Sequence, residues 1–276
     1  MEQAVVGGIT LEYEVSGTGE PVVLIHGALI ADTFRPLLVE SSLASRYQLI
    51  SYHRRGYVGS THTLGPVSVA QQATDCRALL RHLDVERAHV VGDSFGGSVA
   101  LQLTLDFPDV VHSLALLEPA LFVGSTAQAY RDALARGEQR YREERTEVVV
   151  DEFFQPRLGA GYRATLEQVL PGAFAQAVAD ARTAFELEAP ALRGWSFGEA
   201  ELRRITQPVL AVLGGESDAL WPRFGETHRL LLTWLPHAEE FVLPGATHGL
   251  QMQNPRDMAQ ALAGFFLRHP LRSNNA

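Results

Sequence analysis

The chain has 276 residues, of which 46% are hydrophobic and 20% charged, with a mean hydropathy of -0.01. This composition supports a large buried core and excludes a disordered chain, a collagen and a coiled coil. The net charge is -9 and no stretch gathers arginines without interleaved acids, so we expect no nucleic-acid or membrane partner.

All 23 basic residues are arginines, because the sequence contains no lysine. This excludes a Schiff-base lysine, a P-loop lysine and any pyridoxal phosphate enzyme. Cys76 is the only cysteine, which excludes an internal disulfide and a cysteine-based zinc site. The opening MEQAVVGG lacks the basic segment of a secretory signal, and no run of 18 apolar residues could span a membrane. We therefore expect a cytoplasmic protein.

The first half of the chain alternates strand and helix patterns. Residues 9–16 alternate apolar and polar side chains as a half-exposed strand does, and Gly17–Gly19 form the turn that follows. Short apolar runs typical of buried parallel strands come next, at 22–26, 48–52, 89–92 and 113–117. Helical patterns lie between them, at 32–46, 68–83 and 95–107. This alternation predicts a doubly wound, mostly parallel α/β sheet.

The alternation stops near Pro119 and resumes at Pro208. Strands are predicted at 209–213 and 239–243, and helices at 222–235 and 256–268. The interval between the two halves is helical throughout and rich in Arg/Glu pairs, which we interpret as a solvated face. We therefore predict a core domain of residues 1–119 and 205–276, with residues 120–204 as a helical cap over the carboxyl edge of the sheet.

A candidate nucleophile lies in Gly92-Asp93-Ser94-Phe95-Gly96-Gly97, directly between a predicted strand and a predicted helix. A nucleophile in such a turn is held in a strained conformation, and the glycines are needed because a Cβ would collide with the neighbouring elements. A serine hydroxyl also needs a base. His248 supplies it, on a loop that precedes the last helix.

Two residues are candidates for the acid that orients His248. Asp218 follows strand 209–213, which gives the order Ser, Asp, His along the chain. Glu118 closes the preceding strand, and its carboxylate could reach the imidazole from there. We favour Asp218 and keep Glu118 as the alternative, because only geometry decides between them.

An oxyanion hole requires two N–H groups aimed at the carbonyl oxygen of the substrate. The backbone N–H of Phe95, at the start of a helix, is the first candidate. The second is the N–H of Ala28 in His26-Gly27-Ala28-Leu29, at the end of strand 22–26, where glycine lets the chain turn sharply.

These motifs resemble those of the α/β-hydrolase fold superfamily, from about Ile9 to Pro270. The stretch 53–60 (HRRGYVGS) is similar to the Asp-x-Arg-Gly-x-Gly-x-Ser turn of that family, but His53 stands for the aspartate and Val58 for a glycine. The resemblance implies a serine hydrolase with a helical cap. A serine at position 94 argues against the dehalogenases and epoxide hydrolases, in which an aspartate stands there.

We accordingly expect a serine hydrolase that cleaves a small or medium apolar ester or lactone through an acyl-enzyme, without a metal or cofactor. Zearalenone lactonases, which take their acid from the position of Glu118, keep lactones among the substrates. One alternative is a C–C hydrolase of the meta-cleavage type, because Ser94-Phe95-Gly96-Gly97 resembles the nucleophile turn of those enzymes. The other is a ligand receptor on the same fold. The substrate and the oligomeric state are not readable from the sequence. Five apolar side chains are predicted to contact the substrate, namely Leu29, Phe122, Phe153, Trp195 and Trp221.

Overall fold

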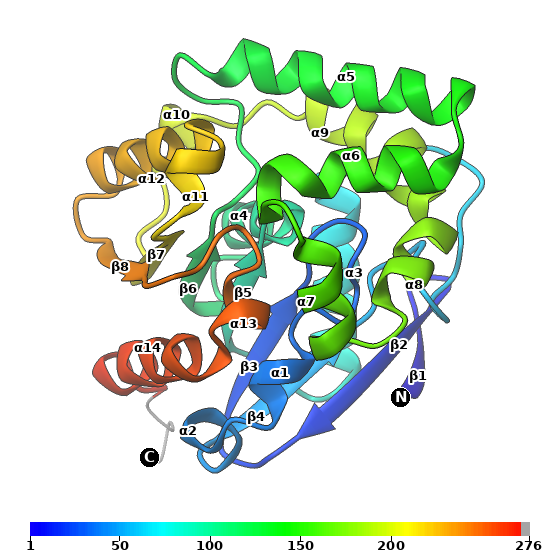
Figure 1. Ribbon diagram of the computed structural model, residues 1–276. Helices are drawn as coiled ribbons and strands as arrows, with labels where there is room; N and C mark the ends of the chain where they lie inside the picture. Colours follow the sequence, from blue (N-terminus) through cyan, green and yellow to red (C-terminus); the bar gives the residue numbers. More distant parts are fainter. Residues whose placement is uncertain (272–276) are drawn as a thin grey trace, which may run out of the picture.

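A single sheet of eight strands organises the protein, and the computed structural model describes residues 1–271 (Figure 1). The strands lie in the order β1-β2-β4-β3-β5-β6-β7-β8. Their bounds are β1 Glu2–Val6, β2 Ile9–Ser16, β3 Glu20–Ile25, β4 Tyr47–Tyr52, β5 Ala88–Asp93, β6 Val111–Leu117, β7 Val209–Gly214 and β8 Glu239–Leu243. Strands β3 to β8 are parallel, whereas β1 and β2 form an antiparallel edge. The predicted α/β sheet is therefore confirmed, and β1 is the strand that the sequence pattern did not indicate.

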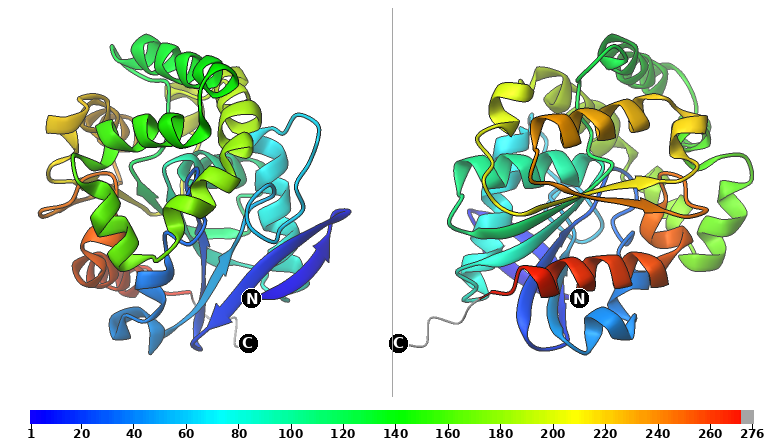
Figure 2. Two further views of the ribbon diagram at one scale, coloured as in Figure 1. Left: turned by 45° about the vertical axis from the view of Figure 1, so that its right-hand side comes forward. Right: turned by 90° about the vertical axis from the view of Figure 1, so that its left-hand side faces the viewer.

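Helices cover both faces of this sheet (Figure 2). One face packs against α3 (Val69–His82), α4 (Phe95–Asp106) and α12 (Arg223–Trp234) through a large apolar cluster. The other face packs against α1 (Arg35–Leu38), α2 (Ser41–Ala44) and α14 (Pro255–Arg268) through a second cluster. The central residues of β3 and β5, at 22–25 and 90–91, are buried and apolar, as expected of strands covered on both faces. The helix predicted at 32–46 is interrupted at Val39–Glu40 and forms the two short helices α1 and α2.

Seven helices lie between β6 and β7, and we call them the cap helices (Figure 1, green to yellow). They are α5 Ala127–Glu143, α6 Thr146–Leu158, α7 Tyr162–Val169, α8 Ala173–Ala179, the π-helix η1 Thr183–Glu188, α9 Ala189–Gly194 and α10 Glu199–Leu202. A third apolar cluster joins α6, α7, α8 and η1 to Leu29 and Ile30 of the loop after β3. The cap helices occupy the interval predicted for the cap, and its standing as a separate domain stays a prediction.

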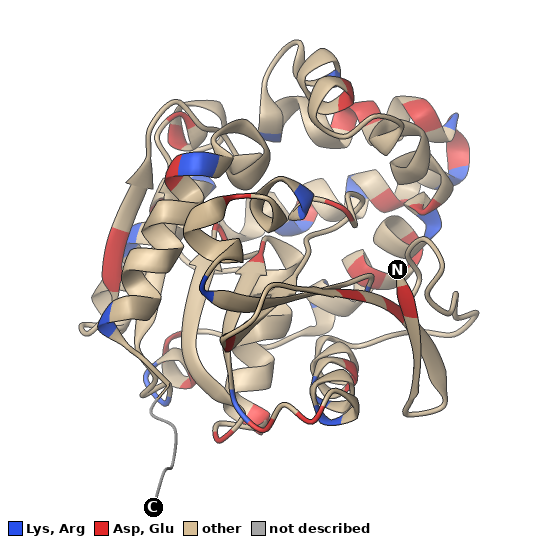
Figure 3. Ribbon diagram, turned by 90° about the horizontal axis from the view of Figure 1, so that it is seen from below, with Lys and Arg blue, Asp and Glu red and all other residues tan. Residues whose placement is uncertain are grey.

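Charged side chains of both signs are interspersed along the helices (Figure 3). On the cap helices several of them pair at the surface, such as Arg142 with Glu138 and Arg182 with Glu186. Such exposed pairs each contribute about 0.5 kcal/mol or less. Among residues 1–271, no helix is both long and apolar enough to cross a membrane.

Candidate active site

Ser94 occupies the turn between β5 and α4, at the carboxyl edge of the sheet. Its φ is 51°, a left-handed conformation that costs a residue with a side chain free energy. Two hydrogen bonds to the neighbouring strand end hold it there: Ser94 N donates to the carbonyl of Leu117, and Ala120 N donates to the carbonyl of Ser94, both at 2.9 Å. A Cβ on Gly92 would lie 2.6 Å from the carbonyl oxygen of Gly96, so the tight turn requires glycine there, as predicted.

His248 lies in the loop between β8 and α13 (Leu250–Gln253). Its Nε2 is 3.0 Å from the Ser94 hydroxyl oxygen. The imidazole stacks on Phe224 at a centroid distance of 4.4 Å, and its backbone N–H donates to the carbonyl of Arg157 at 3.2 Å. The ring is therefore fixed from α12 on one side and from the cap helix α6 on the other.

Glu118, at the end of β6, is the carboxylate that contacts this imidazole. Its Oε2 lies 2.5 Å from His248 Nδ1, and its Oε1 accepts a hydrogen bond from Gly214 N at 2.8 Å. The side chain is only 1% exposed. Like Ser94, Glu118 has a left-handed backbone, with φ 45°. Ser94, His248 and Glu118 thus form one continuous line of hydrogen bonds.

The preference for Asp218 as the orienting acid does not agree with this geometry. Asp218 lies in the short helix α11 (Ser217–Leu220), with its side chain 44% exposed. Its Oδ2 is 3.5 Å from Nη1 of Arg229, on α12. Strand β7 does carry the chain toward the site, but α11 turns Asp218 outward, and Glu118 from the neighbouring strand contacts the imidazole instead.

Ala28, in the loop after β3, lines the cavity that contains Ser94. The guanidinium of Arg54 donates hydrogen bonds to the carbonyls of His26 and Gly27, at 2.9 and 2.8 Å. In a trans peptide the N–H points opposite to the C=O, so the N–H of Ala28 points away from Arg54. Phe95 begins α4, and its N–H is one of the four that a helix leaves without an internal partner. Both N–H groups predicted for the oxyanion hole are therefore free of strand or helix pairing.

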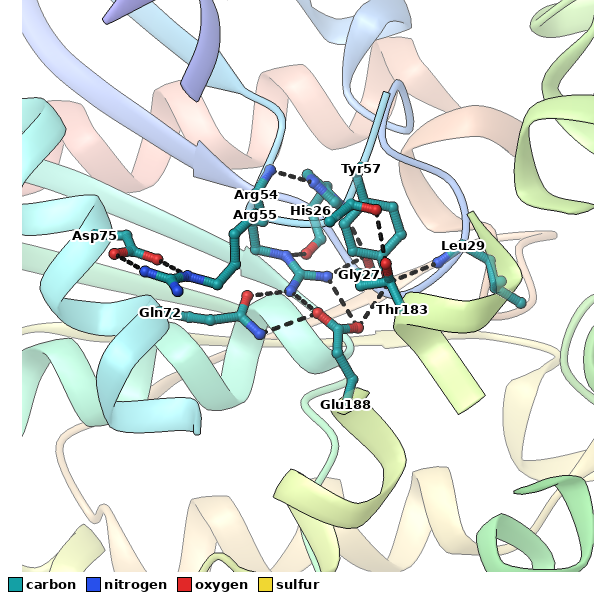
Figure 4. A network of polar contacts seen from close by, with 11 residues as sticks. His26, Gly27, Leu29, Arg54, Arg55, Tyr57, Gln72, Asp75, Thr183 and Glu188 are labelled. Carbon is teal, nitrogen blue, oxygen red and sulfur yellow. Dashed lines mark hydrogen bonds and ion pairs between the residues drawn. The ribbon is translucent and has the colours of Figure 1, made fainter. Parts of the chain in front are cut away.

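A buried polar network holds this loop and connects it to the cap helices (Figure 4). Glu188, at the end of η1, pairs with Arg54, and both side chains are almost completely buried. Glu188 also accepts from the hydroxyl of Tyr57 at 2.7 Å, and Gln72 donates to it at 3.1 Å. The Tyr57 hydroxyl in turn accepts from Leu29 N at 3.4 Å. One cap residue thus fixes both the loop after β3 and the loop after β4.

Two cavities at Ser94 and a third, outer pocket share lining residues. The inner one is lined by Ser94, Phe95, Ala28, His248 and apolar residues of the cap helices. A side cavity shares Ala28, Ser94 and His248 with it. An outer pocket of about 410 Å³ lies between α5 and α6. Phe153 and Arg157 line all three, so they stand at the junction of the route from the surface to Ser94.

The five predicted substrate contacts divide into two groups. Phe153 and Trp221 line these cavities. The other three pack elsewhere: Leu29 in the third apolar cluster, Phe122 under the guanidinium of Arg131 at 4.1 Å, and Trp195 on Phe197 at 4.6 Å. Their large apolar side chains serve the packing of the cap helices, which a sequence pattern does not distinguish from a pocket wall.

Sequence reasoning missed Arg157 and Arg223, which line the inner cavity together with Ser94. Burial lowers the pKa of the Arg157 guanidinium to about 10, and the nearby charge of Arg223 acts in the same direction. No sequence signal singles these two out, because in a chain with 23 arginines most arginines lie at the surface.

Comparison with known proteins now identifies the family. Residues 20–255 match the model of the alpha/beta hydrolase fold family. The chain belongs to this family. Over 281 residues it is 29% identical to the dihydrolipoyllysine-residue acetyltransferase component of an acetoin cleaving system from Pseudomonas putida, covering 97% of this chain and 70% of that protein. Two other curated relatives are matched over only 42% and 38% of their own length.

Two solved alpha/beta hydrolase structures share the whole fold. A thermophilic esterase from Thermogutta terrifontis superposes with a TM-score of 0.83 at 21% identity, covering 98% of this chain and 99% of that one. The enol-lactonase from Burkholderia xenovorans LB400 gives a TM-score of 0.83 at 21% identity, covering 96% and 100%. At this identity the likeness establishes the fold alone, and the family match over residues 20–255 confirms the predicted superfamily.

Replacing Glu188 is expected to destabilise this alpha/beta hydrolase strongly. Glu188→Ala leaves the buried guanidinium of Arg54 without its carboxylate, which costs about 3–5 kcal/mol in the free energy of unfolding. Urea unfolding measures the loss. Glu186→Ala is the control, because Glu186 is on the same π-helix but forms a half-exposed pair with Arg182, so about 1 kcal/mol or less is expected. Equal losses in the two variants would contradict the role given to the buried pair.

We expect Asp93 to lower the free energy of unfolding in a pH-dependent way. Burial raises the pKa of this carboxyl to about 6, and its Oδ1 has no hydrogen-bond partner among the described residues. Between about pH 4 and 6 the folded protein therefore holds a proton that the unfolded chain has lost, so this group lowers stability as the pH rises through that window. Asp93→Asn should raise the free energy of unfolding by about 3 kcal/mol at most at pH 8, and by much less at pH 4.5. A gain of the same size at both values would refute the assignment.

Proposed function

We propose that this protein is a serine hydrolase that cleaves a small or medium carboxylic ester or lactone through an acyl-enzyme. Ser94 is the nucleophile, His248 the base, and Glu118 the acid that orients it. The observation that carries the proposal is the unbroken contact from the Ser94 hydroxyl through Nε2 and Nδ1 of His248 to Glu118, at 3.0 and 2.5 Å. The esterase and the enol-lactonase that share the fold support the choice of bond.

The contact with Glu118 determines which nitrogen of His248 carries the proton. A carboxylate only accepts, so Nδ1 of His248 carries the proton and Nε2 is free to accept from Ser94. When Ser94 Oγ attacks the ester carbon, its proton passes to Nε2, and the imidazolium that forms is stabilised by Glu118. Burial of Glu118 strengthens this interaction, because little water screens it.

The developing oxyanion would be held by the N–H groups of Ala28 and Phe95. Collapse of the tetrahedral intermediate breaks the bond to the leaving alcohol, which takes the proton from Nε2. Water then attacks the acyl-enzyme by the same route in reverse, with His248 again as base. In a lactone the leaving alcohol stays attached to the acyl group, so a single hydroxy acid is released.

Labelling with a fluorophosphonate tests the nucleophile without knowledge of the substrate. The wild type is expected to add one label at Ser94, located by mass spectrometry of the digested protein, and to hydrolyse p-nitrophenyl butyrate. Ser94→Ala should lose the label and the activity, because within residues 1–271 Ser94 is the hydroxyl that contacts His248. If the wild type does not react and turns over no ester, the fold serves as a ligand receptor instead.

Paired substitutions test the acid. Glu118→Gln should lower kcat on the order of 10⁴-fold, because an amide that donates to Nδ1 forces the wrong imidazole tautomer. Asp218→Asn should stay within about threefold of the wild type, since Asp218 is half-exposed and contacts Arg229. Steady-state kinetics with p-nitrophenyl butyrate measures both. The reverse pattern would return the role to Asp218.

A further inference from the structure

Of the four buried arginines within residues 1–271, two have no acidic partner there. Arg54 pairs with Glu188 and Arg55 with Asp75. Arg157 and Arg223 are 7% and 3% exposed, yet within residues 1–271 neither guanidinium has a carboxylate within 4.0 Å. Of the buried acids near Ser94, Glu118 contacts His248, Glu188 pairs with Arg54, and Asp93 forms no ion pair with either guanidinium. Within residues 1–271 the two guanidiniums therefore have no carboxylate in contact, although the charge of Glu118 acts on Arg223 from a greater distance.

Aromatic rings surround these two guanidiniums. Arg157 Cζ lies 3.7 Å from the ring centroid of Phe153, and Arg223 Cζ lies 3.9 Å from that of Tyr130. Both also stack against Trp221, at 4.7 and 5.2 Å, which makes them neighbours. Contacts with aromatic faces return only part of the cost of taking a cation out of water. They also hold the guanidiniums rigidly.

Hydrogen-bond donors remain unused on both side chains. A guanidinium has five N–H groups. Among the described residues Arg157 donates from Nη1 to the carbonyl of Phe153, and the buried Nε of Arg223 has no partner. Arg223 is also the first residue of α12, where the helix dipole disfavours a positive charge. Stability of the fold does not account for a cation at this position.

Both arginines line the inner cavity together with Ser94 and His248. The rest of that lining is mostly apolar, including Leu134, Phe185 and Leu192. This cavity has a volume of only about 30 Å³, so a ligand at Ser94 would have to extend past the two guanidiniums into the outer pocket of about 410 Å³. Its carbon chain would then lie against apolar walls and an anionic group against the guanidiniums.

We propose that Arg157 and Arg223 bind a carboxylate of the substrate, so that the ester or lactone cleaved at Ser94 is an anionic one. The inference rests on the proposed function and narrows it, since the sequence alone indicated an apolar substrate. The planar guanidinium matches the two oxygens of a carboxylate, and two of them supply more donors than one carboxylate needs. The bound carboxylate would supply a negative charge opposite the guanidiniums of Arg157 and Arg223.

Matched pairs of esters test the charge requirement. The anionic set is monomethyl succinate, monomethyl glutarate and monomethyl adipate, and the neutral set is the methyl esters of the corresponding ω-amides, in which CONH₂ replaces COO⁻ at nearly equal size. Alkali uptake at constant pH and ionic strength gives kcat/KM for each ester. The wild type is expected to favour the anionic ester at least tenfold at one chain length or more.

Arginine variants locate that preference. Arg157→Gln and Arg223→Gln should each lower the anionic-to-neutral ratio of kcat/KM by roughly 10- to 100-fold, the effect of hydrogen bonds to a charged group. Arg157→Lys and Arg223→Lys should retain part of the ratio. Arg131→Gln is the control, because Arg131, on α5, also stacks on an aromatic ring, that of Phe122, but does not line the inner cavity. Wild-type ratios near one at all three lengths, or an equal fall in Arg131→Gln, would overturn the proposal.

Binding separates this inference from the proposed function. In Ser94→Ala, titration calorimetry with adipate and with hexanamide should show tighter binding of the dicarboxylate, weakened at least tenfold by adding Arg157→Gln. If the wild type hydrolyses no ester and takes no fluorophosphonate label, the proposed function fails, and the adipate titration still decides whether the arginines bind a carboxylate. No binding of adipate and no anionic preference would together refute it.

Discussion

The buried ion pair between Arg54 and Glu188 is the interaction on which the site depends. A guanidinium and a carboxylate without access to water are favourable only when their remaining donors and acceptors are satisfied. Here Arg54 also donates to the carbonyls of His26 and Gly27, and Glu188 also accepts from Tyr57 and Gln72. The orientation of the Ala28 peptide is thus a by-product of satisfying a buried charge. A cap exchanged for that of a relative would have to bring its own carboxylate to this point.

Strain is concentrated at the same edge of the sheet. Among residues 1–271, five residues other than glycine have a left-handed backbone. Three of them, Leu29, Ser94 and Glu118, belong to the loops that carry the proposed oxyanion hole, nucleophile and acid. Val58, where the family pattern has glycine, is a fourth. The parallel strands supply the restraint, because the bonds of Ser94 with Leu117 and Ala120 join the turn after β5 to the end of β6. The sheet therefore provides the rigidity that a preorganised site requires.

The sequence predicted what depends on local pattern. Strand and helix periods, the glycines around Ser94, and the loop position of His248 are local, and the structure agrees with them. Three features were not local. The choice between Glu118 and Asp218 depends on the direction in which α11 turns after β7. For an apolar cap residue such as Trp195, the sequence pattern is the same whether the side chain packs in the core or lines a pocket. The carboxylate-binding role proposed for Arg157 depends on the lack of a nearby acid among the described residues. The spacing of residues in a sequence does not reveal which side chains lie near one another in the fold.

The end of helix α6 is attached to the histidine loop at two points, through the bond from His248 N to Arg157 O and through that from Thr247 Oγ1 to Leu158 O. If α6 moved away from the sheet to admit a substrate, these two hydrogen bonds would move His248 away from Ser94. Entry of a substrate would therefore be easier by rotation of the Phe153 side chain, which lines all three cavities, with the backbone of α6 in place. Rotamer changes of this kind are far faster than the movement of a helix. Ser94, His248 and Glu118 would then stay in contact in the absence of a ligand. Turnover would not require a conformational change that closes the site.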